Sequence, residues 1–173
     1  MSTKITPTSE EVRMNENDFI VSKTDAKGKI TYCNEIFIRF SGYDEEHLID
    51  QPHNIIRHPD MPRSVYRFMW ETLQKKQEFF GIVKNLCKSG AYYWTFANVT
   101  PSYEDGQLIG YYSVRRQPSR KIVDLLTPVY QQMVAEEAKY SSSKEAMDAS
   151  FKILNDILKT QGLSYSEFVY TNA

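Results

Sequence analysis

Hydrophobic and polar positions alternate along two parts of the chain, around residues 19–33 and 79–116. A spacing of two is typical of β-strands with one buried face. The first part is interrupted at "DAKGK" and the second at "KSG" and "EDGQ", which are turn sequences rich in Gly and Asp. The chain is therefore predicted to form two hairpin-linked strands and, later, three more. The alternation alone does not tell which face of these strands points inward.

Between the two strand regions, hydrophobic positions recur every three or four residues, as in amphipathic helices. "NEIFIRF" predicts a short helix that ends at Ser41 and Gly42, and Asp44 is placed to cap another helical turn. "RSVYRFMWETLQKKQ" predicts a longer helix over 63–77. Two strands, short helices and three strands in this order predict an α+β fold: a five-stranded antiparallel sheet with helices on one face, enclosing a cavity.

The pattern divides the chain into three parts. Residues 1–17 are polar and predict a flexible arm or a short docking helix, residues 18–117 predict one domain, and residues 118–173 predict a C-terminal helical segment. "YSSS" separates two helices in this segment, and Thr127 with Pro128 predicts a break in the first. The second helix carries a short heptad seam formed by Met147, Phe151, Leu154 and Leu158. The seam fits two alternatives, a helix folded back onto the sheet or a surface for dimerisation or partner docking.

Composition narrows the class of protein. The 173 residues carry a formal net charge of −1, which argues against nucleic-acid binding by bulk electrostatics. No apolar run approaches the roughly 18–20 residues that span a bilayer, and the N-terminus lacks the apolar core of a secretory signal. Cys33 and Cys87 lie far apart without a CxxC motif, so we expect reduced, structural thiols in a cytoplasmic protein.

The stretch "PHNIIRHPDMPRSVYRFMW" brings His53, Arg57, His58 and Asp60 together beside hydrophobic residues. No nucleophile elbow, phosphate-binding loop or paired carboxylates accompany them, so an enzyme is not expected. The histidines lack the spacing of a helical metal site, although a haem could use His53 or His58 as a single axial ligand. Arg57 could bind an anionic ligand, or it could simply pair with Asp60 and stiffen the loop.

Two motifs resemble a known family. "NEIFIRFSGY" carries the N-x-x-F-x-x-x-S-G-Y signature that is widespread in PAS domains. "QPHNIIRHPDMP", followed by W-x-x-L, "GIVKN" and "KSGAYYW", is more specific and resembles the FAD-binding PAS domain of Aer-type aerotaxis and energy-taxis receptors. The resemblance covers about residues 18–117 and implies a PAS fold.

The resemblance also implies FAD held non-covalently in the cavity. The residues expected to bind it are Asn34, His53, Arg57, His58, Asp60, Trp70, Phe79 and Asn85. Phe79 stands where the family usually has Trp, which keeps an aromatic face but loses the indole N–H donor. Light-oxygen-voltage photoreceptors are related, but their adduct-forming cysteine would fall within "HNIIRH", which contains none.

The function implied is that of a cytoplasmic redox, oxygen or energy sensor without turnover. The chain resembles stand-alone energy-taxis PAS proteins of the CetB type, which predicts signalling to a separate membrane-bound chemoreceptor-type transducer. We also expect a homodimer that is peripheral to the inner membrane through this partner. The alternatives are a cofactor-free PAS interaction module, whose cavity is filled by side chains, and a haem-binding PAS sensor.

Overall fold

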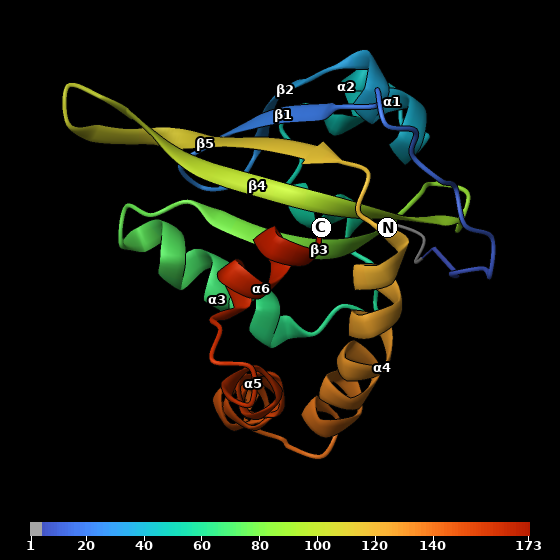
Figure 1. Ribbon diagram of the computed structural model, residues 1–173. Helices are drawn as coiled ribbons and strands as arrows, with labels where there is room; N and C mark the ends of the chain where they lie inside the picture. Colours follow the sequence, from blue (N-terminus) through green and yellow to red (C-terminus); the bar gives the residue numbers. More distant parts are fainter. Residues whose placement is uncertain (1–4) are drawn as a thin grey trace.

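The computed structural model describes residues 5–173 and contains a five-stranded antiparallel sheet (Figure 1). The strand order is β2-β1-β5-β4-β3, so the first and last parts of the domain meet where β1 pairs with β5. The strands are β1 (Ile20–Asp25), β2 (Ile30–Cys33), β3 (Phe79–Leu86), β4 (Tyr92–Glu104) and β5 (Gln107–Arg116). The predicted α+β fold is confirmed.

Four short helices cover one face of the sheet, which we call the inner face. They are α1 (Glu35–Ser41), α2 (Glu45–Leu48), the 3-10 helix η1 (His53–Ile56) and α3 (Arg63–Gln74). α1 ends at Gly42 in the left-handed conformation (φ 72°), as predicted. Asp44 precedes α2 but makes no side-chain capping bond. α3 stops three residues short of the predicted end, and Lys76 turns the chain with a φ of 61°.

The C-terminal segment forms α4 (Arg120–Glu137), α5 (Ser143–Lys159) and α6 (Tyr165–Asn172). The predicted break at Pro128 is wrong, because α4 runs through it. The Thr127 hydroxyl donates to the Val123 carbonyl at 2.7 Å instead of capping a new helix, and Ser119 caps α4. No helix in the described part of the chain is long and apolar enough to cross a membrane.

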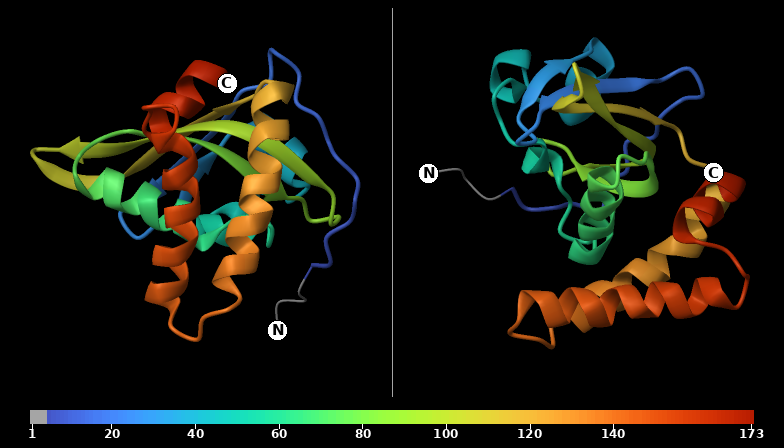
Figure 2. Two further views of the ribbon diagram at one scale, coloured as in Figure 1. Left: turned by 60° about the horizontal axis from the view of Figure 1, so that its bottom comes forward. Right: turned by 90° about the vertical axis from the view of Figure 1, so that its left-hand side faces the viewer.

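These three helices pack against α3 and the β3 side of the sheet (Figure 2). On β3, the Ile82 carbonyl accepts from the Tyr130 hydroxyl at 2.9 Å, and the Ile82 N–H donates to the Tyr165 hydroxyl at 3.1 Å. The two hydroxyls also bond each other at 2.6 Å, so they satisfy backbone groups of an edge strand.

The heptad seam of α5 packs within the chain. Leu154 and Leu158 are buried in the main hydrophobic cluster, and Phe151 stacks on Phe68 of α3 with ring centres 5.0 Å apart. α5 does fold back, but onto α3 and α4 instead of onto the sheet, and dimerisation or partner docking stays a prediction. A coiled coil through these positions would require α5 to leave α3 and α4.

The N-terminal arm forms no helix between residues 5 and 17. Glu11 makes a β-bridge with Tyr92 and an ion pair with Arg120 at 2.7 Å, while Met14 is buried. The described arm therefore forms no docking helix and is packed along the domain at these residues. Residues 1–4 lie outside the described residues.

Candidate cofactor site

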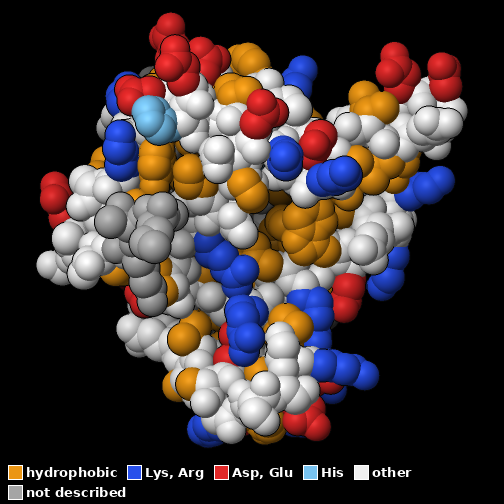
Figure 3. All heavy atoms as spheres, turned by 180° about the vertical axis from the view of Figure 1, so that it is seen from behind, with side chains coloured by type: hydrophobic (Ala, Val, Ile, Leu, Met, Phe, Trp, Pro, Cys, Tyr) orange, Lys and Arg blue, Asp and Glu red, His pale blue; other side chains and the backbone are white. Residues whose placement is uncertain are grey.

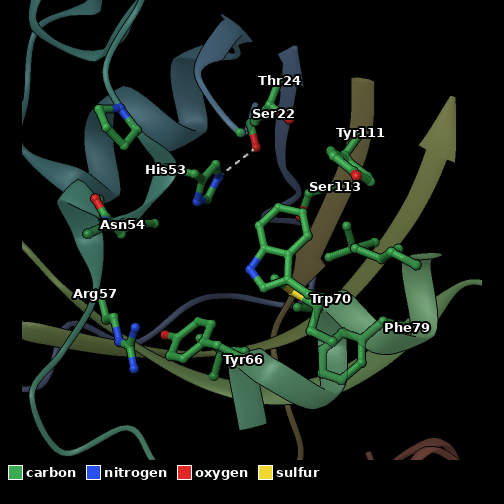
Figure 4. A pocket seen from close by; sticks show the side chains of 18 of the residues that line it. Ser22, Thr24, His53, Asn54, Arg57, Tyr66, Trp70, Phe79, Tyr111 and Ser113 are labelled. Carbon is green, nitrogen blue, oxygen red and sulfur yellow. Dashed lines mark hydrogen bonds between the residues drawn. The ribbon is translucent and has the colours of Figure 1, made fainter. Parts of the chain in front are cut away.

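A cavity of about 270 Å³ lies between the inner face and the helices η1 and α3 (Figure 4). Alternate residues of β3 and β4 line it, including Val83, Asn85, Ala97 and Val99. Their neighbours Trp94 and Phe96 point to the opposite, outer face, where the C-terminal helices pack. The structure thus decides which face of the strands points inward.

One part of the cavity lining is a hydrogen-bonded chain of polar groups from three elements. Arg115 on β5 donates through Nη2 to the Ser22 hydroxyl on β1, and that hydroxyl lies 3.0 Å from Nε2 of His53 on η1. Burial, with the positive charge of Arg115 beside it, lowers the pKa of His53 to about 3. His53 is therefore neutral at physiological pH and can bond to Ser22 without carrying a second positive charge.

Arg115 is the most unusual group in the cavity because its charge is buried without a carboxylate. The residue is 3% exposed, and its Nε and Nη1 atoms have no hydrogen-bond partner among residues 5–173. Its guanidinium lies 4.6 Å from the ring centre of Phe37. Burial lowers its pKa to about 10, so it stays protonated at neutral pH. Two unpaired donors next to an open cavity can bind a ligand acceptor or a negative charge.

Aromatic side chains of α3 form the opposite wall. Trp70 meets Tyr111 of β5 edge to face, with ring centres 5.1 Å apart, and Tyr66 lies under the guanidinium of Arg57 at 4.1 Å. Phe79 also lines the cavity. Such flat apolar walls with a few polar groups suit a planar aromatic ligand.

Five of the eight residues predicted from the resemblance line this cavity, namely His53, Arg57, Trp70, Phe79 and Asn85. Asn85 is buried on β3, and its amide nitrogen lies 3.5 Å from the Thr95 hydroxyl. The backbone of Asn85 also pairs with Arg57 in an isolated β-bridge, which ties the loop carrying Arg57 to the sheet.

The structure does not bring Asn34, His58 and Asp60 to the cavity. Asn34 caps α1, accepting from the N–H groups of Phe37 and Val21. His58 is buried and accepts through Nδ1 from the Asp60 N–H at 3.1 Å; burial, together with the nearby Lys84, lowers its pKa to about 4.

Asp60 faces outward and pairs with Lys84 at 2.7 Å. The Arg57–Asp60 pair that the sequence left open does not form, because the turn after Pro59 directs the two side chains to different neighbours. His58 and Asp60 therefore belong to the loop that carries Arg57 and do not themselves line the cavity.

Sequence reasoning missed the residues that make the cavity polar. They are Ser22, Thr24, Lys27, Asn54, Tyr66, Tyr111, Ser113 and Arg115. The alternation along β5 contained the signal, since Tyr111, Ser113 and Arg115 are two residues apart and so share a face. An arginine near a strand end is normally expected to be solvent-exposed, so Arg115 was not predicted to line the cavity.

Candidate metal ligands and thiols give no further site. Within residues 5–173, no three His, Cys, Asp or Glu side chains gather closely enough to hold a metal ion. Cys33 and Cys87 are buried free thiols, as predicted, and burial raises the pKa of Cys87 to about 11. A thiol with so high a pKa is unreactive at neutral pH.

Comparison with known proteins places this geometry in a class. Residues 30–115 match the family model described as the PAS fold. The structure of the blue-light photoreceptor Aureochrome1 LOV superposes with a TM-score of 0.56 at 17% identity, covering 64% of this chain and 82% of that one. The cavity-bearing part of the chain is therefore a PAS domain.

Relatives among characterised proteins narrow the class further. The chain is 37% identical to the aerotaxis receptor of Escherichia coli (strain K12) over 128 residues, which are 74% of this chain and 25% of the receptor. It is 33% identical to the nitrogen fixation regulatory protein of Klebsiella pneumoniae over 100 residues, 57% of this chain and 20% of that protein. The PAS domain is thus homologous to that of the aerotaxis receptor, while the chain spans a quarter or less of these relatives' length.

Proposed function

We propose that this protein is a redox sensor that binds FAD in its PAS cavity and signals in energy taxis. The proposal is supported by the relationship to the aerotaxis receptor and by an aromatic-walled cavity that its own side chains leave open. An open cavity also disfavours the alternative of a cofactor-free module with a filled interior.

The observation that carries the proposal is the unpaired guanidinium of Arg115. A buried cation without a partner costs free energy, and a ligand that brings an acceptor or negative charge would offset that cost. Bound flavin would supply reversible electron uptake, which adds negative charge to its ring system. Arg115 is placed to favour the reduced form by hydrogen bonding and by its charge.

The residues around Arg115 provide a way to report such a change. A turn of the Arg115 guanidinium toward new negative charge would alter its bond to Ser22, and Ser22 is bonded to His53. These three side chains join β5, β1 and η1, and Asn85 adds a buried amide on β3. A change of charge would therefore bias the arrangement of several elements at once.

A second connection leads from the cavity wall to the C-terminal helices. Glu137 of α4 accepts from the N–H groups of Arg63 and Ser64 at the start of α3, each at 3.1 Å. It also accepts from the Ser150 hydroxyl of α5 at 2.8 Å. Because α3 carries Tyr66 and Trp70, a shift of this cavity wall would change the hydrogen bonds that Glu137 accepts from α3.

The partner we propose is a separate membrane-bound chemoreceptor-type transducer, with the sensor acting as a homodimer in the cytoplasm. The support for this part is the relationship to the aerotaxis receptor and the motif resemblance to energy-taxis PAS proteins. The C-terminal helices, which contact α3 directly, are the part of the chain best placed to pass a signal on.

The visible spectrum of the purified full chain tests the cofactor assignment. We expect a yellow protein with flavin absorption bands, or a flavin-free protein that takes up added FAD. A colourless protein that takes up no FAD would refute the proposal, and a Soret band would replace it with a haem sensor. An Arg57→Ala variant that retains FAD in full would refute the assignment of Arg57 to the site while leaving the fold intact.

A further inference from the structure

A second hollow lies directly outside the cavity, and we call it the α3–α5 groove. It has a volume of about 410 Å³ and is lined by Arg57, Arg63, Tyr66, Arg67, Trp70, Glu71, Gln74 and Met147. All of these residues belong to α3 or the loop before it, except Met147, which comes from α5. The groove is therefore formed jointly by the PAS domain and its C-terminal segment.

The groove continues the cavity. Arg57, Tyr66 and Trp70 line both hollows, so a ligand that leaves the cavity between these side chains enters the groove. Figure 4 shows Arg57 and Tyr66 side by side at this junction. The cavity alone, at about 270 Å³, lies just below the range of small-molecule pockets, roughly 300–1,000 Å³. A flavin dinucleotide is longer than its flavin ring, so with the ring in the cavity the rest of the molecule must extend outside it.

The groove presents positive charge at the place where such an extension would begin. Arg57 stacks on Tyr66 and makes no ion pair within residues 5–173. Arg63 and Arg67 follow at a spacing of four along α3 and so share one face of the helix. On the side of the molecule seen in Figure 3, Lys and Arg side chains gather next to a patch of exposed hydrophobic side chains.

Arg63 and Arg67 have carboxylate neighbours but keep free donors. Arg63 pairs with Glu137 at 3.2 Å, and Arg67 pairs with Asp148 of α5 at 2.7 Å. Each guanidinium has five N–H donors in a geometry that matches phosphate oxygens. Asp148 and Glu71 are more than half exposed, so they can turn into solvent when a phosphate approaches.

We propose that the α3–α5 groove binds the ADP half of FAD, so that α5 completes the dinucleotide site. The inference rests on the proposed function, because it places the ring system in the PAS cavity. The diphosphate bonds to Arg57 at the junction and to Arg67 farther out, and Met147 gives the adenine an apolar contact. Cofactor binding then holds α5 against α3, which makes the position of the C-terminal segment depend on the cofactor.

The test compares the affinities of riboflavin, FMN and FAD for the flavin-free full chain, because these ligands extend successively farther from the ring. We expect FAD to bind more tightly than FMN, and FMN more tightly than riboflavin. Arg67→Gln should weaken FAD by about tenfold, since it removes a charge-assisted bond to phosphate, and should leave riboflavin unchanged. Asp148→Asn should strengthen FAD severalfold by removing the competing carboxylate, again without an effect on riboflavin.

Arg120→Gln is the matched control, because Arg120 is also an ion-paired helical arginine but lies on α4 and pairs with Glu11. It should change none of the three affinities. Equal binding of FAD and riboflavin, or identical FAD-to-riboflavin ratios in the wild type, Arg67→Gln and Asp148→Asn, would overturn the inference and leave the flavin sensor standing. A chain that binds none of the three ligands would overturn both.

Discussion

The two faces of the sheet are built from alternate residues of the same strands, yet they differ in how their buried polar groups are paired. On the outer side, at the β3 edge, Tyr130 and Tyr165 satisfy the backbone of Ile82 and bond each other. On the inner face, Arg115 keeps two unpaired donors next to an open cavity. Both faces contain buried polar groups, but the unpaired buried cation lies on the inner face, beside the cavity.

This difference separates a structural surface from a binding surface. A protein interior normally pairs its polar groups and fills its space, as the outer face does. An interior with unpaired polar groups and an open cavity has a higher free energy, which a bound ligand can lower. We therefore expect substitutions on the outer face to change stability with little effect on FAD, and substitutions in the cavity to do the reverse.

The largest effect on stability should come from Leu154→Ala on α5. Leu154 is 1% exposed and lies in the main hydrophobic cluster, so truncation should cost about 2–5 kcal/mol of unfolding free energy. Urea denaturation of the flavin-free protein measures it. Lys152→Ala, on the exposed side of the same helix, should change the free energy little. A cost below 1 kcal/mol for Leu154→Ala would mean that α5 is not packed as described.

Glu137→Gln should have the next largest effect, about 2–3 kcal/mol, because it replaces a buried carboxylate that accepts four hydrogen bonds. Burial raises the pKa of Glu137, but bonds from the N–H groups of Ser64 and Arg63 and from the Ser150 hydroxyl outweigh it, and the net pKa is below the ordinary 4.5.

Because the pKa of Glu137 is lower in the folded than in the unfolded protein, the ionised carboxylate stabilises the fold above pH 4.5. This stabilisation is lost as the pH falls through the pKa of the folded state. Urea denaturation of the flavin-free protein at a series of pH values should show this acid-dependent loss in the wild type and a smaller one in Glu137→Gln. Identical pH profiles would contradict the role given to this carboxylate.

Arg115→Met is the corresponding change in the cavity. In the flavin-free protein it should leave stability unchanged or raise it by about 1–3 kcal/mol, because it removes an unpaired buried charge. With FAD bound, it should lower the reduction potential by disfavouring negative charge on the ring. Arg116→Met, the next residue on the opposite face, is the matched control and should alter neither quantity much. A loss of several kcal/mol in flavin-free Arg115→Met would mark Arg115 as structural.

The smallest effect near neutral pH should come from the two buried histidines. The folded pKa is about 3 for His53 and about 4 for His58, below the ordinary 6.5, so the unfolded chain binds more protons below pH 6.5 and stability falls as the pH falls. His53→Gln should reduce this loss by about 1.4 kcal/mol per pH unit between pH 6.5 and 3. His58→Gln should also reduce the loss of stability on acidification, but only between pH 6.5 and about pH 4. Urea titrations at each pH would contradict this account if neither slope changed.

Much of the fold could be predicted from the sequence because local signals and tertiary packing agree. "DAKGK" and "EDGQ" form turns with positive φ at Gly28, Asp105 and Gly106, and Asn34 caps the helix that its position suggested. The break at Pro128 failed because a Thr-Pro pair also fits inside a helix whose packing against the sheet compensates for one lost hydrogen bond.

The candidate site was predictable only in part. His53, Arg57, Trp70, Phe79 and Asn85 were found through motif resemblance, and they do line the cavity. Arg115 was missed because its burial depends on residues distant in sequence, such as Phe37, and on the pairing of β1 with β5. No local pattern carries that information.

The most direct test of the central claim is a titration of FAD into the flavin-free full chain and two variants, one for each face of the sheet. We predict that one FAD binds per wild-type chain, that Arg115→Met weakens binding by about tenfold or more, and that Tyr130→Phe leaves the affinity unchanged although it costs stability. Equal affinity of Arg115→Met and the wild type, or the absence of any FAD binding, would contradict the assignment of the inner face as the cofactor site.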